Sequence, residues 1–182
     1  MSWGIRVGDW PAAVDCGTLP MLQVNLTKLF TKGIKALVSY QNRNYIRDEA
    51  KFDDYFTLEF NPAKFKYQLL ATEVFQKYVD WFAAYRGDIG DEEFIYLDFE
   101  QSRGIDYRNG IYRLLPVFFL ETELCTKCFG LSPEEIGKRI AGTVESSIIT
   151  PTGMVVVASS KVLNLDEAKD IDKQLREVLE LR

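Results

Sequence analysis

The sequence predicts a single α+β domain over residues 1–182, in which a mixed or antiparallel sheet packs against about four helices. Strand and helix patterns alternate in the order β-β-α-β-β-α-α-β-α, but several of the gaps are only long enough for hairpins. This mixture favours an α+β fold over a strictly parallel one. With 47% hydrophobic residues, including 12 Phe, 9 Tyr and 3 Trp, the chain has material for one well-packed core.

The first third of the chain predicts two strands. Residues 1–20 are rich in Gly, Pro and small residues, and they predict a loop-like lead-in with one short strand at most. Residues 34–41 have β character through Leu37, Val38 and Tyr40. Residues 55–60 alternate between apolar and polar side chains, which is typical of a strand with one buried face.

A long amphipathic helix is predicted next. Asn61 and Pro62 have the residue types of an N-cap and a first helical position. Apolar side chains then recur at helical spacing as far as Tyr85. Gly87 and Gly90 predict the end of this helix and a turn.

The middle of the chain predicts two further strands. Residues 94–100 alternate, with Ile95, Leu97 and Phe99 on one face. Residues 101–110 predict a loop. Residues 111–120 are apolar and rich in β-formers, and Pro116 there indicates a sheet edge or a bulge.

The last third predicts three helices and one strand. A short helix is expected over residues 121–129. Ser132 and Glu135 form a capping-box pattern for a helix that reaches about Ser146. Residues 154–159 are apolar enough for a central strand. Asn164 begins the final helix, again with a capping-box pattern.

Composition excludes several classes of function. The sequence contains no histidine, so Ser-His-Asp and Cys-His catalysis and histidine-containing zinc sites are excluded. A net charge of −5 disfavours binding to nucleic acid and to anionic membranes. We expect no secretory signal, no membrane span and no cofactor. Three cysteines suggest no disulfide framework, which favours the cytoplasm.

Two groups of residues suggest chemistry, and each has a structural alternative. Cys125 and Cys128 have the C-x-x-C spacing of redox and metal sites, but their apolar neighbours favour two core cysteines. Asp98 and Glu100 would share one face of the predicted strand, where two carboxylates can bind a divalent cation or act as acid and base. The alternative for this pair is a solvated strand face.

A third group suggests a protein-binding surface. Residues 86–100 carry six acidic residues and one basic residue, and arginines alternate with tyrosines in the segment that follows. Tyr and Arg are enriched at binding hot spots. The alternative is that these loop residues pair with the acidic segment itself. The predicted binding residues are Asp88, Asp91, Glu92, Glu93, Arg103, Tyr107, Arg108 and Tyr112.

The leading hypothesis for function is therefore a non-catalytic cytoplasmic protein-binding domain. An acidic surface accelerates association with a basic partner, so a toxin-neutralising immunity or inhibitor-type protein fits the composition. Self-association into a homodimer is a further possibility. The alternative hypothesis is a carboxylate-dependent, metal-assisted hydrolase that uses Asp98 and Glu100.

Overall fold

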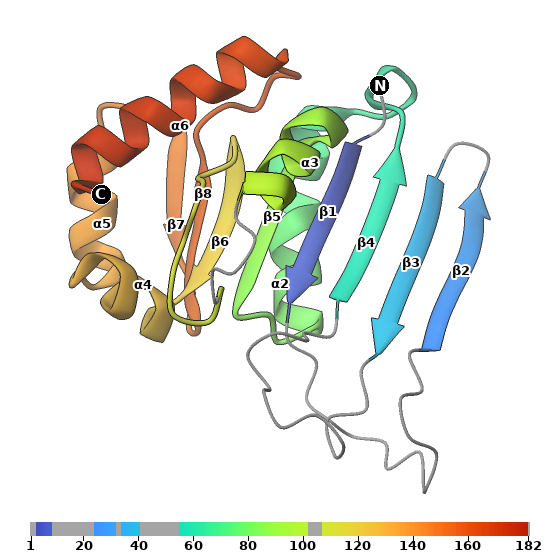
Figure 1. Cartoon of the computed structure of the whole chain (residues 1–182), viewed down its shortest axis with the longest axis horizontal. Helices are drawn as coiled ribbons and strands as arrows, with labels where there is room; N and C mark the ends of the chain where they lie inside the picture. Colours follow the sequence, from blue (N-terminus) through green and yellow to red (C-terminus); the bar gives the residue numbers. More distant parts are fainter. Residues whose placement is uncertain (1–2, 9–23, 32–33, 41–54, 102–106, 182) are drawn as a thin grey trace, which may run out of the picture.

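A computed structural model describes residues 3–8, 24–31, 34–40, 55–101 and 107–181, with side chains for residues 56–97, 101 and 107–181. Its centre is an eight-stranded sheet with the order β2-β3-β4-β1-β5-β6-β8-β7 (Figure 1). Every neighbouring pair in this sheet is antiparallel. The predicted α+β class is confirmed.

The first four strands form half of the sheet. They are β1 (Trp3–Gly8), β2 (Val24–Thr31), β3 (Ile34–Tyr40) and β4 (Tyr55–Phe60). The predictions for β3 and β4 are confirmed, β1 is the one short strand allowed in the lead-in, and β2 was not predicted. The remainder of residues 1–20 lies outside the described residues.

The predicted helix after β4 is present, but it is shorter and interrupted. Asn61 accepts a hydrogen bond from the Ala63 N–H at 2.9 Å and begins the 3₁₀ turn η3 (Pro62–Lys64). The helix continues as α1 (Tyr67–Leu69), the π-helical segment η4 (Leu70–Val74) and α2 (Phe75–Trp81). It ends at Trp81 rather than Tyr85, and Ala83 has a left-handed φ of 43° that turns the chain back toward the sheet.

Two predictions in the middle of the chain are wrong. The expected turn at Gly87 and Gly90 is instead β5 (Arg86–Asp91), an inner strand whose six residues are all buried. The expected strand at residues 94–100 is instead the helix α3 (Glu92–Gln101). The Asp91 carboxylate accepts the Glu93 N–H at 2.9 Å, which satisfies an otherwise unpaired donor of the first turn and fixes the start of α3.

The second half of the sheet follows the predictions more closely. Besides β5, it consists of β6 (Val117–Glu121), β7 (Ser146–Ile149) and β8 (Gly153–Val157), of which β7 was not predicted. β6 starts only after Pro116 and is an inner strand, so this proline marks the beginning of a strand rather than an edge. Since proline has no N–H to donate, its carbonyl makes the link to β8 by accepting from the Ala158 N–H at 2.8 Å.

Three helices accompany these strands, all of them predicted. They are α4 (Thr122–Phe129), α5 (Pro133–Ile140) and α6 (Leu165–Leu179). Both predicted capping boxes, at Ser132 and Asn164, are formed. α5 ends at Ile140 instead of Ser146, and the residues after it turn into β7 at the edge of the sheet.

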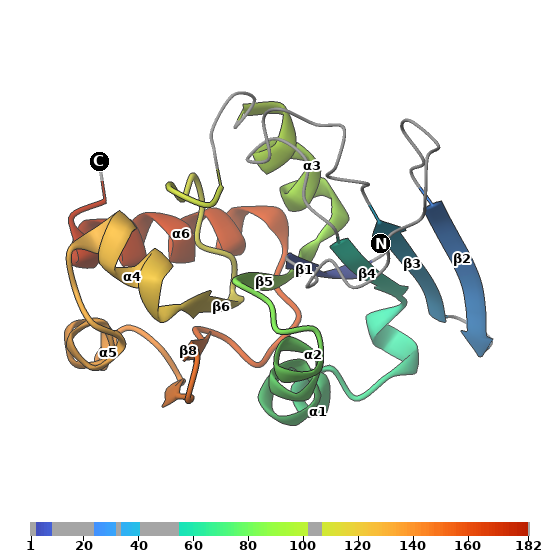
Figure 2. The same ribbon diagram turned by 90° about the horizontal axis from the view of Figure 1, so that it is seen from below.

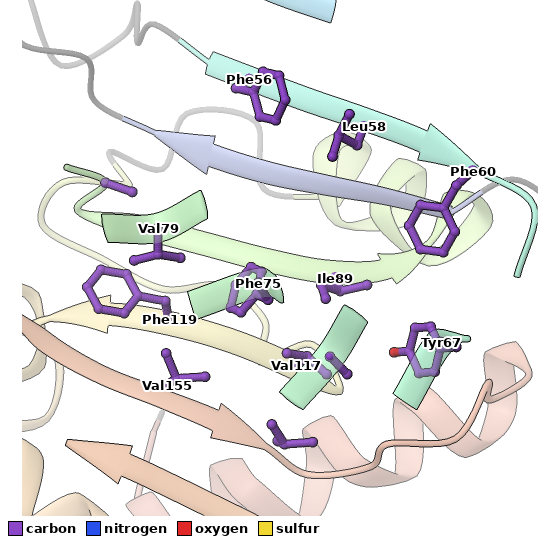
Figure 3. Close-up of a cluster of buried hydrophobic side chains, with 13 residues drawn as sticks. Phe56, Leu58, Phe60, Tyr67, Phe75, Val79, Ile89, Val117, Phe119 and Val155 are labelled. Atoms are coloured by element: carbon purple, nitrogen blue, oxygen red, sulfur yellow. The ribbon is translucent and has the colours of Figure 1, made fainter. Parts of the chain in front are cut away.

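Helices cover both faces of the sheet (Figure 2). On one face, α1, η4 and α2 pack on β4, β5, β6 and β8, with Phe75 and Val79 of α2 beside the apolar residues of the sheet (Figure 3). On the opposite face, α4, α5 and α6 pack on β6 and β8. Among the described residues, no helix has the length and apolar character needed to cross a membrane.

Candidate protein-interaction site

Helix α3 presents the clearest candidate surface for binding. Glu92 and Glu93 are exposed, and the Tyr96 side chain is 61% exposed. Because residues three and four apart are neighbours on a helix, these three side chains share one outer face. On the inner face, Phe94 is fully buried against Leu115 and Ala168. α3 is therefore anchored by one aromatic residue and exposes another.

Acidic residues of α6 extend this surface. Leu165 and Ala168, in the first turn of α6, belong to the same apolar cluster as Phe94, so the two helices begin close together. Around this contact α6 exposes three acidic residues and one basic residue: Asp166, Glu167, Asp170 and Lys169. We call the six exposed side chains the acidic face: Glu92, Glu93, Tyr96, Asp166, Glu167 and Asp170.

Two predicted binding residues do not reach the surface. Asp88 is only 3% exposed and Asp91 only 5%. The Asp88 carboxylate lies 3.7 Å from the guanidinium of Arg86, which is itself buried, and Asp91 caps α3. Charges removed from water require a partner. Asp88 meets Arg86, and one Asp91 oxygen accepts the Glu93 N–H, whereas the other Asp91 oxygen is buried without a hydrogen-bond partner among the described residues. Their prediction as surface residues is corrected accordingly.

The predicted Arg/Tyr segment also makes contacts within the protein. The Arg86 guanidinium lies 4.3 Å from the centre of the Tyr107 ring, and that of Arg108 lies 5.7 Å from the Tyr85 ring. The Tyr112 hydroxyl donates to Gln101 of α3 at 3.5 Å. Arg103 lies outside the described residues. The structure thus joins this segment to β5 and α3, and its tyrosines are only partly exposed.

The geometry expected of Asp98 and Glu100 is not present. Both residues lie on α3, so the spacing of a strand, on which their pairing was predicted, does not apply. The strand that would have paired them is absent from this part of the chain. Among the described residues, moreover, no three Asp, Glu or Cys side chains gather in a group that could hold a metal ion.

The two cysteines on α4 belong to the core. Cys125 is fully buried and Cys128 is partly buried. Burial raises the pKa of Cys125 to about 12 and that of Cys128 to about 11. A reactive cysteine needs a lowered pKa, because the thiolate is the nucleophile and the metal ligand. The environment of this C-x-x-C therefore opposes redox and metal chemistry.

Sequence reasoning missed Tyr96 and the acidic residues of α6. The predicted strand over residues 94–100 includes Tyr96, and on a strand its spacing from Glu92 and Glu93 does not place the three side chains together. For the α6 residues the sequence does carry a signal. The capping box at Asn164 predicts where the helix begins, and acidic residues are favoured in the first turn of a helix. Their closeness to α3 comes from tertiary packing around Phe94, which the sequence does not reveal. Comparisons with protein families, curated proteins and solved structures found no match.

Proposed function

We propose that this protein is a non-catalytic binding domain whose acidic face docks on a basic protein. The observation that carries the proposal is the exposed side chain of Tyr96, one helical turn along α3 from the exposed Glu92 and Glu93. α3 contains four acidic residues and no basic one. An exposed tyrosine in this setting suits an arginine or lysine of a partner, through contact with the ring and with the carboxylates.

The electrostatics of this face suit an inhibitor. Carboxylates around a contact residue attract a basic partner over distance and raise the association rate. A toxin-neutralising protein must capture its target quickly, so an immunity or inhibitor-type role is our specific proposal. We place the protein in the cytoplasm, where the free thiols of Cys125 and Cys128 would persist. Homodimerisation is an alternative use of the same surface.

The helical form of α3 gives the hydrolase alternative less support. It required Asp98 and Glu100 on one face of a strand, and α3 places them two residues apart on a helix. A depression of 610 Å³ along α6 is lined by Asp172, Lys173, Arg176 and three further residues of the same chain end. These charged side chains come from a single helix and its C-terminal end, which favours a surface feature over a reaction centre.

The test is an affinity experiment with two matched variants. The first, Glu92→Lys/Glu93→Lys/Tyr96→Ala, changes the acidic face. The second, Glu73→Lys/Asp80→Lys/Trp81→Ala, makes the same changes on the opposite side of the sheet, where Trp81 is 71% exposed. Each variant shifts the net charge equally and removes one exposed aromatic side chain.

The tagged proteins are purified from their host at low salt, and a captured protein is identified, purified and titrated by calorimetry. We expect a basic partner that binds the wild type and the control variant, binds the α3 variant at least about tenfold more weakly, and is released by salt. Equal binding by all three proteins would overturn the proposed site. A complex of this chain with itself alone would favour the homodimer.

A further inference from the structure

Arg113 connects the two helices of the acidic face. Its guanidinium lies 5.2 Å from the centre of the Phe94 ring and donates a hydrogen bond to the side-chain oxygen of Gln101, both on α3. Another nitrogen of the same group lies 3.8 Å from the Asp172 carboxylate on α6. The Arg113 side chain is only 13% exposed, and its contacts with Phe94 and Asp172 are shielded from water, whereas Gln101 is exposed.

The positions of these contacts matter for α3. Phe94 lies in the first turn of the helix and Gln101 is its last residue, about 10 Å further along the axis. The apolar cluster around Phe94 holds the first turn, whereas the last turn is held by polar contacts from Tyr112 and Arg113. Two attachment points at opposite ends fix the direction of a helix, and Arg113 contributes to both.

The α6 side of the link is built to hold Arg113 in place. The Asp172 carboxylate accepts the backbone N–H of Leu114 at 2.8 Å, so its position is fixed beside Arg113. One turn further along α6, Arg176 donates a hydrogen bond to the carbonyl of Tyr112. The segment Tyr112–Leu114 is therefore fastened to α6, and Arg113 reaches from it to α3.

We propose that Arg113 is a positioning residue, which holds α3 in the orientation that presents Glu92, Glu93 and Tyr96. The proposal rests on the proposed function for its biological meaning, but the docking of α3 can be measured without a partner. Arginine suits this role because its planar guanidinium can stack on a ring and donate to two carbonyl or carboxylate groups at once. Lysine offers a single charged centre and cannot do both.

Hydrogen exchange of the full chain, followed by mass spectrometry, tests the docking. In Arg113→Met we expect amides of α3 to exchange about tenfold faster or more, while those of α2 keep their wild-type rates. Arg113→Lys should fall between the two, because it retains a charge for Asp172. Gln101→Ala, which leaves the α6 contact intact, should accelerate only the last turn of α3.

Two results with Arg113→Met would overturn the proposal, and a third result, with Arg113→Lys, would refute the argument about its charge. One is an unchanged exchange rate in α3 of Arg113→Met. The other is an equal rise in α2 and α3, which would mean that Arg113 only supports global stability. Equal rates in Arg113→Lys and Arg113→Met would likewise refute the argument that the charge and its contact with Asp172 matter.

A double-mutant cycle with the purified partner then connects docking to binding. If Arg113 acts through α3, the loss of affinity in Arg113→Met/Tyr96→Ala is smaller than the sum of the two single losses. Additive losses would contradict this link. Failure of the proposed function gives a different pattern, in which the α3 surface variant binds normally while the exchange result for Arg113 still holds.

Discussion

Replacing Gly153 by alanine should destabilise the protein strongly, because this glycine lies against the backbone of the neighbouring strand. A Cβ at position 153 would lie 2.1 Å from the carbonyl oxygen of Leu120 and 2.6 Å from the Cα of Glu121. Ordinary van der Waals contact begins at 3.4 Å. Since no side-chain rotation can relieve a clash with backbone, β6 and β8 must separate locally by more than 1 Å.

The size of the effect follows from what that separation disturbs. Gly153 is paired with Glu121 at the end of the β6–β8 ladder. It also closes the turn to β7, where its carbonyl accepts the Thr150 N–H at 2.8 Å and its N–H donates to the Thr150 hydroxyl at 3.0 Å. Overpacking costs about 1–3 kcal/mol, and weakening these hydrogen bonds adds to it. We expect a net loss of at least about 2 kcal/mol.

Thermal unfolding followed by circular dichroism measures this loss. For a chain of this length, about 2 kcal/mol corresponds to a fall in Tm of roughly 4–8 °C. Gly142→Ala is the matched control, since a Cβ there meets nothing within 4 Å. It should leave Tm unchanged or raise it slightly, because alanine restricts the unfolded chain. A Tm for Gly153→Ala within about 2 °C of that of Gly142→Ala would refute the packing argument.

Two further predictions concern stability. The raised pKa values of Cys125 and Cys128 keep both thiols protonated in the folded protein above pH 9, where an unfolded thiol of ordinary pKa ionises. Because the unfolded state then binds fewer protons than the folded state, the free energy of unfolding should fall as the pH rises from about 9 to 11. Urea unfolding of Cys125→Ala/Cys128→Ala should show a flatter dependence in this range, and an equal slope would contradict the burial of these thiols. Ser132→Ala and Asn164→Ala each remove a capping box and should each cost about 1 kcal/mol in the same assay, whereas an unchanged midpoint would show that the caps contribute nothing.

The elements that the sequence predicts well are those with local chemical signals. The capping boxes at Ser132 and Asn164 and the apolar run of β8 depend on neighbours in the chain, and all three are present. β5 lacks such a signal. Its Arg86 and Asp88 are buried because they meet each other and Tyr107, and its Gly90 lies where a Cβ would be 2.3 Å from Leu115. The contacts with Tyr107 and Leu115 join residues that are far apart in the sequence, so they form only in the folded molecule.

The error at α3 had a different cause and carried over to the candidate site. The run from Phe94 to Glu100 alternates as a strand does, but Phe94 and Leu97 are also three apart, as on a helix. The acidic residues just before this run, with Asp91 as a cap, favour a helix over a strand. Because this run is helical, the strand spacing on which the pairing of Asp98 and Glu100 was predicted is absent, while Tyr96 joins Glu92 and Glu93 on one face.

The position of β1 has a consequence for how the chain folds. In the described sheet, β4 and β5 are not paired with each other; each is paired with β1, so the strand Trp3–Gly8 joins the two halves. Trp3 pairs with Asp91, 88 residues later. During synthesis β1 must therefore wait for β5 before this pairing forms, and contacts of such separation slow folding. A synthetic peptide of this strand, added to a chain that lacks it, should pair with both β4 and β5 and so rejoin the two halves of the sheet. Its binding would report directly on this step of assembly.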